Sequence, residues 1–125
     1  MGASVELLPL TTIEGEGADP LYQDVGETID TSRYESGVVT SRVLQVETDT
    51  PGTYDLTFTV QGSDDGESWS TIMSFTAPGE DTKYLNRSQQ PEQGEYLWRY
   101  VRWILTPSAG TTDWKFCGRV TVVLK

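Results

Sequence analysis

Hydrophobic and polar residues alternate with a period of two along several short stretches of this chain. In residues 54–61 the odd positions are Asp, Thr, Thr and Gln, and the even positions are apolar: Tyr54, Leu56, Phe58 and Val60. Such alternation is typical of a β-strand with one buried face and one solvent-exposed face. No stretch of twelve residues shows a helical 3.6-residue period. The pattern therefore predicts an all-β chain.

The same alternation predicts the other strands. In residues 114–124 one face carries Trp114, Phe116, Val120, Val122 and Leu124, with Gly118 as a gap or bulge. In residues 96–106 the inward positions are Leu97, Val101, Trp103 and Leu105. Further strands are predicted at 38–47, with Leu44 and Val46 inward, at 71–75 and at 83–85, and weaker ones at 5–8 and 27–30.

Turn signals separate these runs at short intervals, for example at residues 63–66, 77–79 and 107–110. About seven or eight short antiparallel strands spaced in this way are typical of a β-sandwich. We expect one domain in two parts. Residues 1–37, which are polar and acidic, form an N-terminal arm or long loop with one or two short strands, and residues 38–125 form the sandwich body.

Composition narrows the function classes. The 125 residues include no histidine and one cysteine, Cys117, which excludes a Ser-His-Asp triad, a Cys-His pair and an intrachain disulfide. The net charge of −10 argues against nucleic acid and against anionic membrane surfaces as partners. The N-terminus lacks the pattern of a secretory signal, so folding in a cytoplasm is expected. We expect no enzymatic activity.

The charge is unevenly distributed along the chain. Residues 1–67 contain 14 acidic and two basic residues, whereas residues 68–125 contain five acidic and seven basic residues. One interpretation is a solvated acidic half that keeps the protein soluble. The other is a subunit with one acidic end and one basic end, so that opposite ends attract each other in an assembly. Complementary charge of this kind sets docking orientation and rate.

Three acidic residues in one loop are the candidate metal ligands. Asp64, Asp65 and Glu67 could offer oxygen atoms to a calcium ion, although their spacing is not that of an EF-hand. The alternative is a plain hairpin loop in which Asp65-Gly66 forms the turn. No other cofactor is expected.

A second group of residues is the candidate interface. Trp98, Tyr100, Arg102 and Ile104 alternate with the inward positions of residues 96–106 and would point outward. Aromatic side chains anchor protein interfaces at low entropic cost. The alternative is that a bulge or the N-terminal arm covers them. We expect the other three tryptophans, Trp69, Trp103 and Trp114, to lie in the core with Phe58.

Three segments taken in order resemble a known group of folds. They are Gln-Gly-Ser-Asp-Asp-Gly-Glu-Ser-Trp at 61–69, Trp-Arg-Tyr-Val-Arg-Trp-Ile-Leu at 98–105 and the closing strand at 119–124. This order is similar to discoidin-like and galactose-binding-like jelly rolls. It also resembles the small jelly-roll decoration, cement or tail-attached proteins of tailed bacteriophage particles.

The resemblance implies a jelly-roll sandwich and a structural role in a virion. The expected partner is a capsid or tail surface, bound as a homo-oligomer with a trimer favoured. The expected location is the virion surface, after synthesis in the host cytoplasm. The resemblance equally leaves open a carbohydrate-binding jelly-roll module, in which loops at one end of the barrel bind ligand, and bound calcium near such loops. A third alternative is an accessory domain of a larger extracellular protein.

Overall fold

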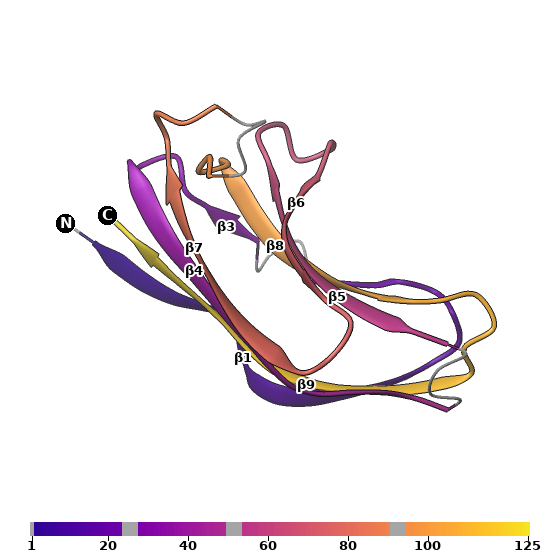
Figure 1. The fold of residues 1–125 in the computed structure, drawn as a ribbon. Helices are drawn as coiled ribbons and strands as arrows, with labels where there is room; N and C mark the ends of the chain where they lie inside the picture. Colours follow the sequence, from indigo (N-terminus) through magenta and orange to yellow (C-terminus); the bar gives the residue numbers. More distant parts are fainter. Residues whose placement is uncertain (1, 24–27, 50–53, 91–94) are drawn as a thin grey trace.

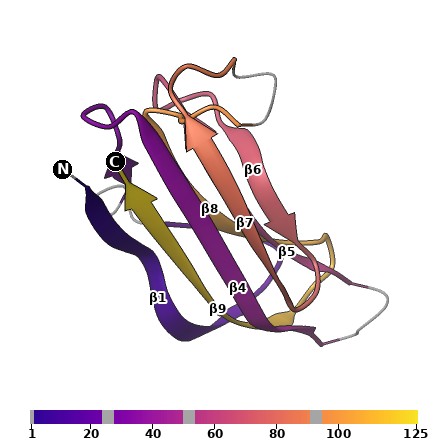
Figure 2. The same cartoon turned by 60° about the vertical axis from the view of Figure 1, so that its left-hand side comes forward.

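Two antiparallel β-sheets packed face to face make up the chain in the computed structural model, which describes residues 2–23, 28–49, 54–90 and 95–125. Figure 1 shows the two layers, and Figure 2 shows the first sheet from outside. The strands in these residues are β1 (Ala3–Glu16), β2 (Leu21–Tyr22), β3 (Ile29–Asp30), β4 (Ser36–Thr48), β5 (Leu56–Ser63), β6 (Ser70–Phe75), β7 (Gly79–Asn86), β8 (Tyr100–Pro107) and β9 (Asp113–Leu124).

The strand order is that of a jelly roll. The first sheet has the order β1-β9-β4-β7, and the second has the order β2-β8-β5-β6, with β3 also paired to β8. Because β2 and β3 pair antiparallel with different parts of the same strand, they form one interrupted strand. Counted as one, they leave eight strands in the described residues, in the orders 1-8-3-6 and 2-7-4-5, which is the arrangement of a jelly roll. The predicted fold class is confirmed.

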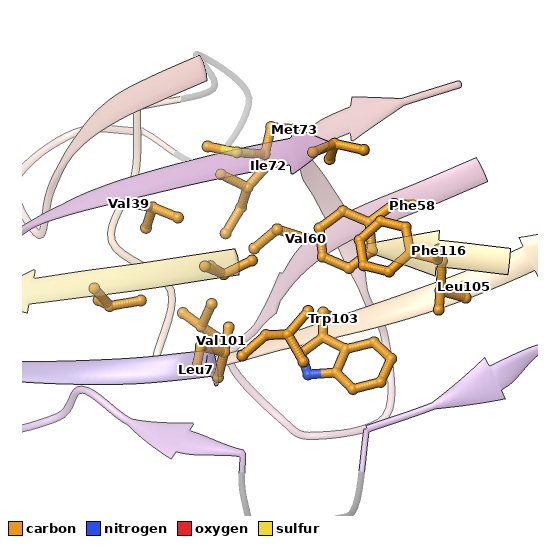
Figure 3. Packing of buried hydrophobic residues seen from close by; sticks show 14 of the residues in the cluster. Leu7, Val39, Phe58, Val60, Ile72, Met73, Val101, Trp103, Leu105 and Phe116 are labelled. Atoms are coloured by element: carbon orange, nitrogen blue, oxygen red, sulfur yellow. The ribbon is translucent and has the colours of Figure 1, made fainter. Parts of the chain in front are cut away.

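The core between the sheets consists of the inward side chains of both layers. The rings of Phe58 on β5 and Phe116 on β9 stack with their centroids 4.6 Å apart, and Trp103 on β8 lies 6.2 Å from Phe58 (Figure 3). Phe58 and Phe116 are completely buried, and Trp103 and Trp114 nearly so. These positions confirm the predicted inward faces of the segments 54–61, 96–106 and 114–124.

Two predictions about strand phase and length are wrong. Leu44, expected inward, is 46% exposed, because a register shift between Val43 and Gln45 opposite Gly118 reverses the phase of β4 at this point. The short strand expected at residues 5–8 is instead part of the 14-residue β1, which pairs with β9 from Ala3 opposite Leu124 to Glu16 opposite Asp113.

The expected arm is therefore, over residues 3–16, an edge strand of the first sheet. Register shifts on both sides of Leu8 bury Leu7 and Leu8 together and hide the alternation. The weak strand expected at 27–30 is present as β3, although residues 24–27 lie outside the described part. The division of the domain into residues 1–37 and a body of residues 38–125 stays a prediction. The described residues contain no helix long and apolar enough to cross a membrane.

Truncation of the stacked core aromatic tests this packing. We expect Phe58→Ala to lower the free energy of unfolding by roughly 3–5 kcal/mol, because it removes a buried ring and leaves a cavity between the sheets. Urea denaturation measures the change. Thr57→Ala, one position along the same strand on its half-exposed outer face, is the control and should cost less than about 0.5 kcal/mol. Equal small effects of both substitutions would contradict the assigned faces.

Candidate interaction surface

Arginine and aromatic side chains gather on the outer face of the second sheet. We define the arginine–aromatic surface as Tyr22 on β2, Trp69 next to β6, Arg99 next to β8, and Tyr100 and Arg102 on β8. The strand pairings bring them together, because β8 lies between β2 and β5, and β6 lies on the far side of β5. The surface surrounds a hollow of about 300 Å³, which is lined by Gln23, Thr28, Asp65, Gly66, Trp69, Tyr100 and Arg102.

Arg102 is held in place from three sides. Its guanidinium carbon lies 3.9 Å from the centre of the Trp69 ring and 5.1 Å from that of Tyr22. Its Nε donates a hydrogen bond to Oε1 of Gln61, 2.9 Å away on the neighbouring strand β5. Burial lowers the pKa of Arg102, but an arginine remains protonated at neutral pH. The result is a partly buried cation whose orientation is fixed by stacking.

The terminal nitrogens of Arg102 are not paired with a carboxylate in the described part of the chain. The ion pairs there join Arg99 to Asp30, Lys115 to Glu14 and Arg119 to Glu6. A guanidinium group offers five N–H donors in a rigid planar fork, and the bond to Gln61 uses only the one on Nε. Arg102 can therefore bind a carboxylate from outside the subunit without first breaking an internal ion pair.

The loop after β5 uses its aspartates for internal bonds. Oδ1 of Asp65 accepts hydrogen bonds from the Ser63 hydroxyl and from the backbone N–H groups of Glu67 and Ser68, at 2.8–2.9 Å. These bonds, led by those from Ser68 and Glu67, lower the pKa of Asp65 to about 2. Gly66 has a φ of 78°, a left-handed conformation that suits glycine, so Asp65-Gly66 forms the turn as expected.

Asp64 fastens the same loop to the segment before β8. Its two carboxylate oxygens accept hydrogen bonds from the Tyr96 hydroxyl (2.9 Å) and the Arg99 backbone N–H (3.0 Å). Glu67, the third candidate calcium ligand, is exposed. In the described ranges no three histidine, cysteine or acidic residues are arranged to hold a metal ion. The geometry favours a hairpin loop that supports its neighbours.

Two of the four candidate interface residues belong to this surface, and the other two are covered by neighbouring residues or packed against the core. Tyr100 and Arg102 lie on the outer face and are half-buried. Ile104 also has the outward phase but is only 7% exposed, and Thr59 and Tyr22 flank it on the adjacent strands. Trp98 packs against the core, with its ring edge-on to Tyr96 at 5.0 Å. Trp98 and Ile104 therefore do not form the exposed apolar surface that we expected.

Sequence reasoning missed three members of this surface, which are Arg99, Trp69 and Tyr22. Trp69 was expected in the core, but it is half-buried, and its ring lies beneath Arg102. It belongs to the turn just before β6, so the alternation of a strand does not fix where its side chain points. Tyr22 lies in the segment expected to be an arm and is 53% exposed. The one signal that could have found them is an arginine on the outer face of a strand close to several aromatic residues, since such pairs form cation–π contacts.

Arg87, which directly follows β7, holds the chain segment that leads into β8 and the arginine–aromatic surface. Its Nη1 donates to the carbonyl of Leu97 (2.8 Å), and its Nη2 donates to those of Thr31 (2.6 Å) and Tyr34 (3.1 Å). Thr31 in turn donates from its hydroxyl to the carbonyl of Trp98. One guanidinium group thus joins the segment after β3 to the segment that leads into β8.

No family model matches the chain, and a search of curated proteins also finds no match. Solved structures do resemble it. A chain from the Gx strain of infectious bursal disease virus has a TM-score of 0.51 and 7% identity, covering 99% of this chain and 32% of that one. A chain from the T13 particle of the same virus has a TM-score of 0.49 and 12% identity, covering 98% and 30%.

A third similar structure comes from Bacillus endospore appendages, described as disulfide-linked pili. It has a TM-score of 0.48 and 12% identity and covers 100% of this chain and 90% of that one. The present chain spans about a third of the length of the virus chains that it matches. At 7% identity the likeness to the chain of the Gx strain shows the β-sandwich fold alone, and the role of the present chain must be argued from its own residues.

The internal bonds of Asp65 predict a pH-dependent stability. Because folding lowers the pKa of Asp65 from its ordinary value of 3.8 to about 2, its ionised form stabilises the fold above pH 4. This contribution is lost as the pH falls through 2. We expect the difference in melting temperature between the wild type and Asp65→Asn to shrink as the pH falls from 4 to 2. Glu67→Gln, whose side chain makes none of these bonds, should show no such trend.

The bonds of Arg87 predict a large effect of removing its charge. Arg87→Met leaves the carbonyls of Thr31, Tyr34 and Leu97 without this donor and should lower the free energy of unfolding by roughly 2 kcal/mol or more. Arg87→Lys keeps one ammonium group and should lose less. Urea denaturation of both variants compares them. An Arg87→Met variant as stable as the wild type would show that water replaces the guanidinium without cost.

Proposed function

We propose that this chain is a non-enzymatic structural protein of a virus particle, which decorates or cements a bacteriophage capsid or is attached to the tail through protein–protein contacts. It would be made in the host cytoplasm and act at the virion surface as a homo-oligomer, with a trimer favoured. The observation that carries the proposal is the arginine–aromatic surface, because it offers a fixed cation, with no ion pair to any described carboxylate, among aromatic anchors on a rigid sheet.

The fold supports this proposal. Jelly-roll sandwiches occur in viral capsid proteins, and the virus chain of the Gx strain is similar in fold over nearly the whole of the present chain. The fold itself does not select a function, so the role in a particle rests on this chain's own surface.

A carbohydrate-binding module is the second candidate, because three aromatic residues and a hollow lie on one face. Sugars bind such modules by stacking on flat aromatic rings. Here, however, Arg102 lies over the rings of both Trp69 and Tyr22, and Arg99 lies 5.0 Å from the centre of the Tyr100 ring. Each ring therefore already has a guanidinium group against one face. The geometry favours a protein partner over a neutral sugar.

Binding to native particles tests the proposal. Particles prepared from a virus that lacks the gene should bind the added purified chain at a fixed number of copies, and electron microscopy should show the extra density on the head or tail. Particles that already carry the chain, which have no vacant positions, are the control. A chain that is absent from wild-type particles and does not bind stripped ones would contradict the proposal, and specific binding on a glycan array would favour the second candidate.

A further inference from the structure

A cluster of acidic residues lies at the end of the sandwich opposite the loops that surround the arginine–aromatic surface. β8 begins with Tyr100 beside that surface and ends at Pro107, and a short loop then leads to Asp113 at the start of β9 (Figure 1). Around Asp113 the ends of β1 and β4 contribute more carboxylates. We define this acidic end as Glu14, Glu16, Glu47, Asp49 and Asp113, which surround Lys115.

Two carboxylates of the acidic end are available for an external contact. Glu14 forms an ion pair with Lys115 at 3.5 Å, and Asp49 accepts a hydrogen bond from the Thr112 hydroxyl at 2.7 Å. Glu16 and Glu47 are exposed, and neither forms an ion pair within the described part of the chain. Both lie in strands that pair with β9, so rigid backbone fixes their position.

The two surfaces match in chemistry but cannot meet within one chain. Arg102 has terminal N–H groups that fit a carboxylate in a bidentate geometry, and stacking on Trp69 already restricts its side chain. Such a pair loses less conformational entropy than one between two mobile side chains. The surfaces face different directions on a rigid sandwich. Only a second copy can therefore bring this acidic end to this arginine.

We propose that copies of this chain associate head to tail, with the acidic end of one copy seated on the arginine–aromatic surface of the next and a carboxylate of Glu16 or Glu47 bound to Arg102. This inference describes how copies meet in the proposed assembly and rests on that proposal. The contact joins two different surfaces and is therefore heterologous. Three copies close into the favoured trimer if the rotation between neighbours is a third of a turn, and otherwise the contact extends into a larger ring or filament.

Two complementary variants test the contact. Arg102→Glu destroys the arginine–aromatic surface but keeps the acidic end, and Glu16→Gln/Glu47→Gln removes the carboxylates of the acidic end but keeps the arginine–aromatic surface. Light scattering should show each variant alone as a monomer at concentrations where the wild type associates. An equimolar mixture should form a dimer with one copy of each and no larger species, because only one functional contact then remains. Raising the salt from ~0.05 M to ~0.5 M should dissociate the wild-type assembly, since screening weakens a contact based on charge.

Matched controls separate this contact from general charge effects and from misfolding. Arg42→Glu makes the same charge change on the outer face of the first sheet and should associate like the wild type. Arg102→Met removes the donors while keeping an apolar stem over Trp69, so it should fold normally and still fail to associate. Circular dichroism and thermal melting confirm that each variant is folded.

Several results would overturn the inference. They are a wild-type chain that stays monomeric at high micromolar concentration, single variants that still associate, or a mixture that forms no dimer. A monomeric chain that binds an acidic peptide through Arg102 would also overturn it, because the occupant would then not be a second copy. These outcomes are independent of particle binding. A chain present in particles but failing the mixing test would retain the proposed function and lose only the head-to-tail contact.

Discussion

The stacked contact between Phe58 and Phe116 joins the two sheets, and the exposed surfaces depend on it. Phe58 belongs to β5 and Phe116 to β9, so this pair links a central strand of each sheet across the core. Side chains alternate along each strand, and the inward position of Phe58 therefore sets the outward position of Gln61 three residues later. Gln61 in turn holds Arg102 on the adjacent strand. The orientation of the candidate interaction surface thus follows from the core beneath it.

Much of this fold could be predicted from the sequence where the alternation is uninterrupted. The closing strand β9 keeps its buried face from Trp114 to Leu124 because Gly118 occupies an inward position without adding a side chain. The prediction of strand phase or strand length failed where a strand carries a bulge. Leu44 in β4 and the pair Leu7–Leu8 in β1 both sit at register shifts, and a shift of one residue reverses the face of every side chain beyond it.

The candidate surface was less predictable, because it depends on register between strands. Tyr100 and Arg102 could be placed on an outward face from their own strand alone. Their neighbours Tyr22 and Trp69 come from segments 78 and 33 residues away from Tyr100 and Arg102, respectively, and only the pairing of β2, β5 and β6 around β8 places them together. The same limit applies to Arg87, whose acceptors are backbone carbonyls that leave no pattern in the sequence.

The pairing of the first and last strands has a practical consequence. Ala3 lies opposite Leu124, so the two ends of the described chain emerge side by side at one end of the sandwich, away from the acidic end (Figure 2). A short peptide could bridge them, which permits a circularly permuted chain opened at an exposed turn such as the one at Gly66. It also permits the whole sandwich to be inserted into a loop of a carrier protein, with both of its broad faces left uncovered for display.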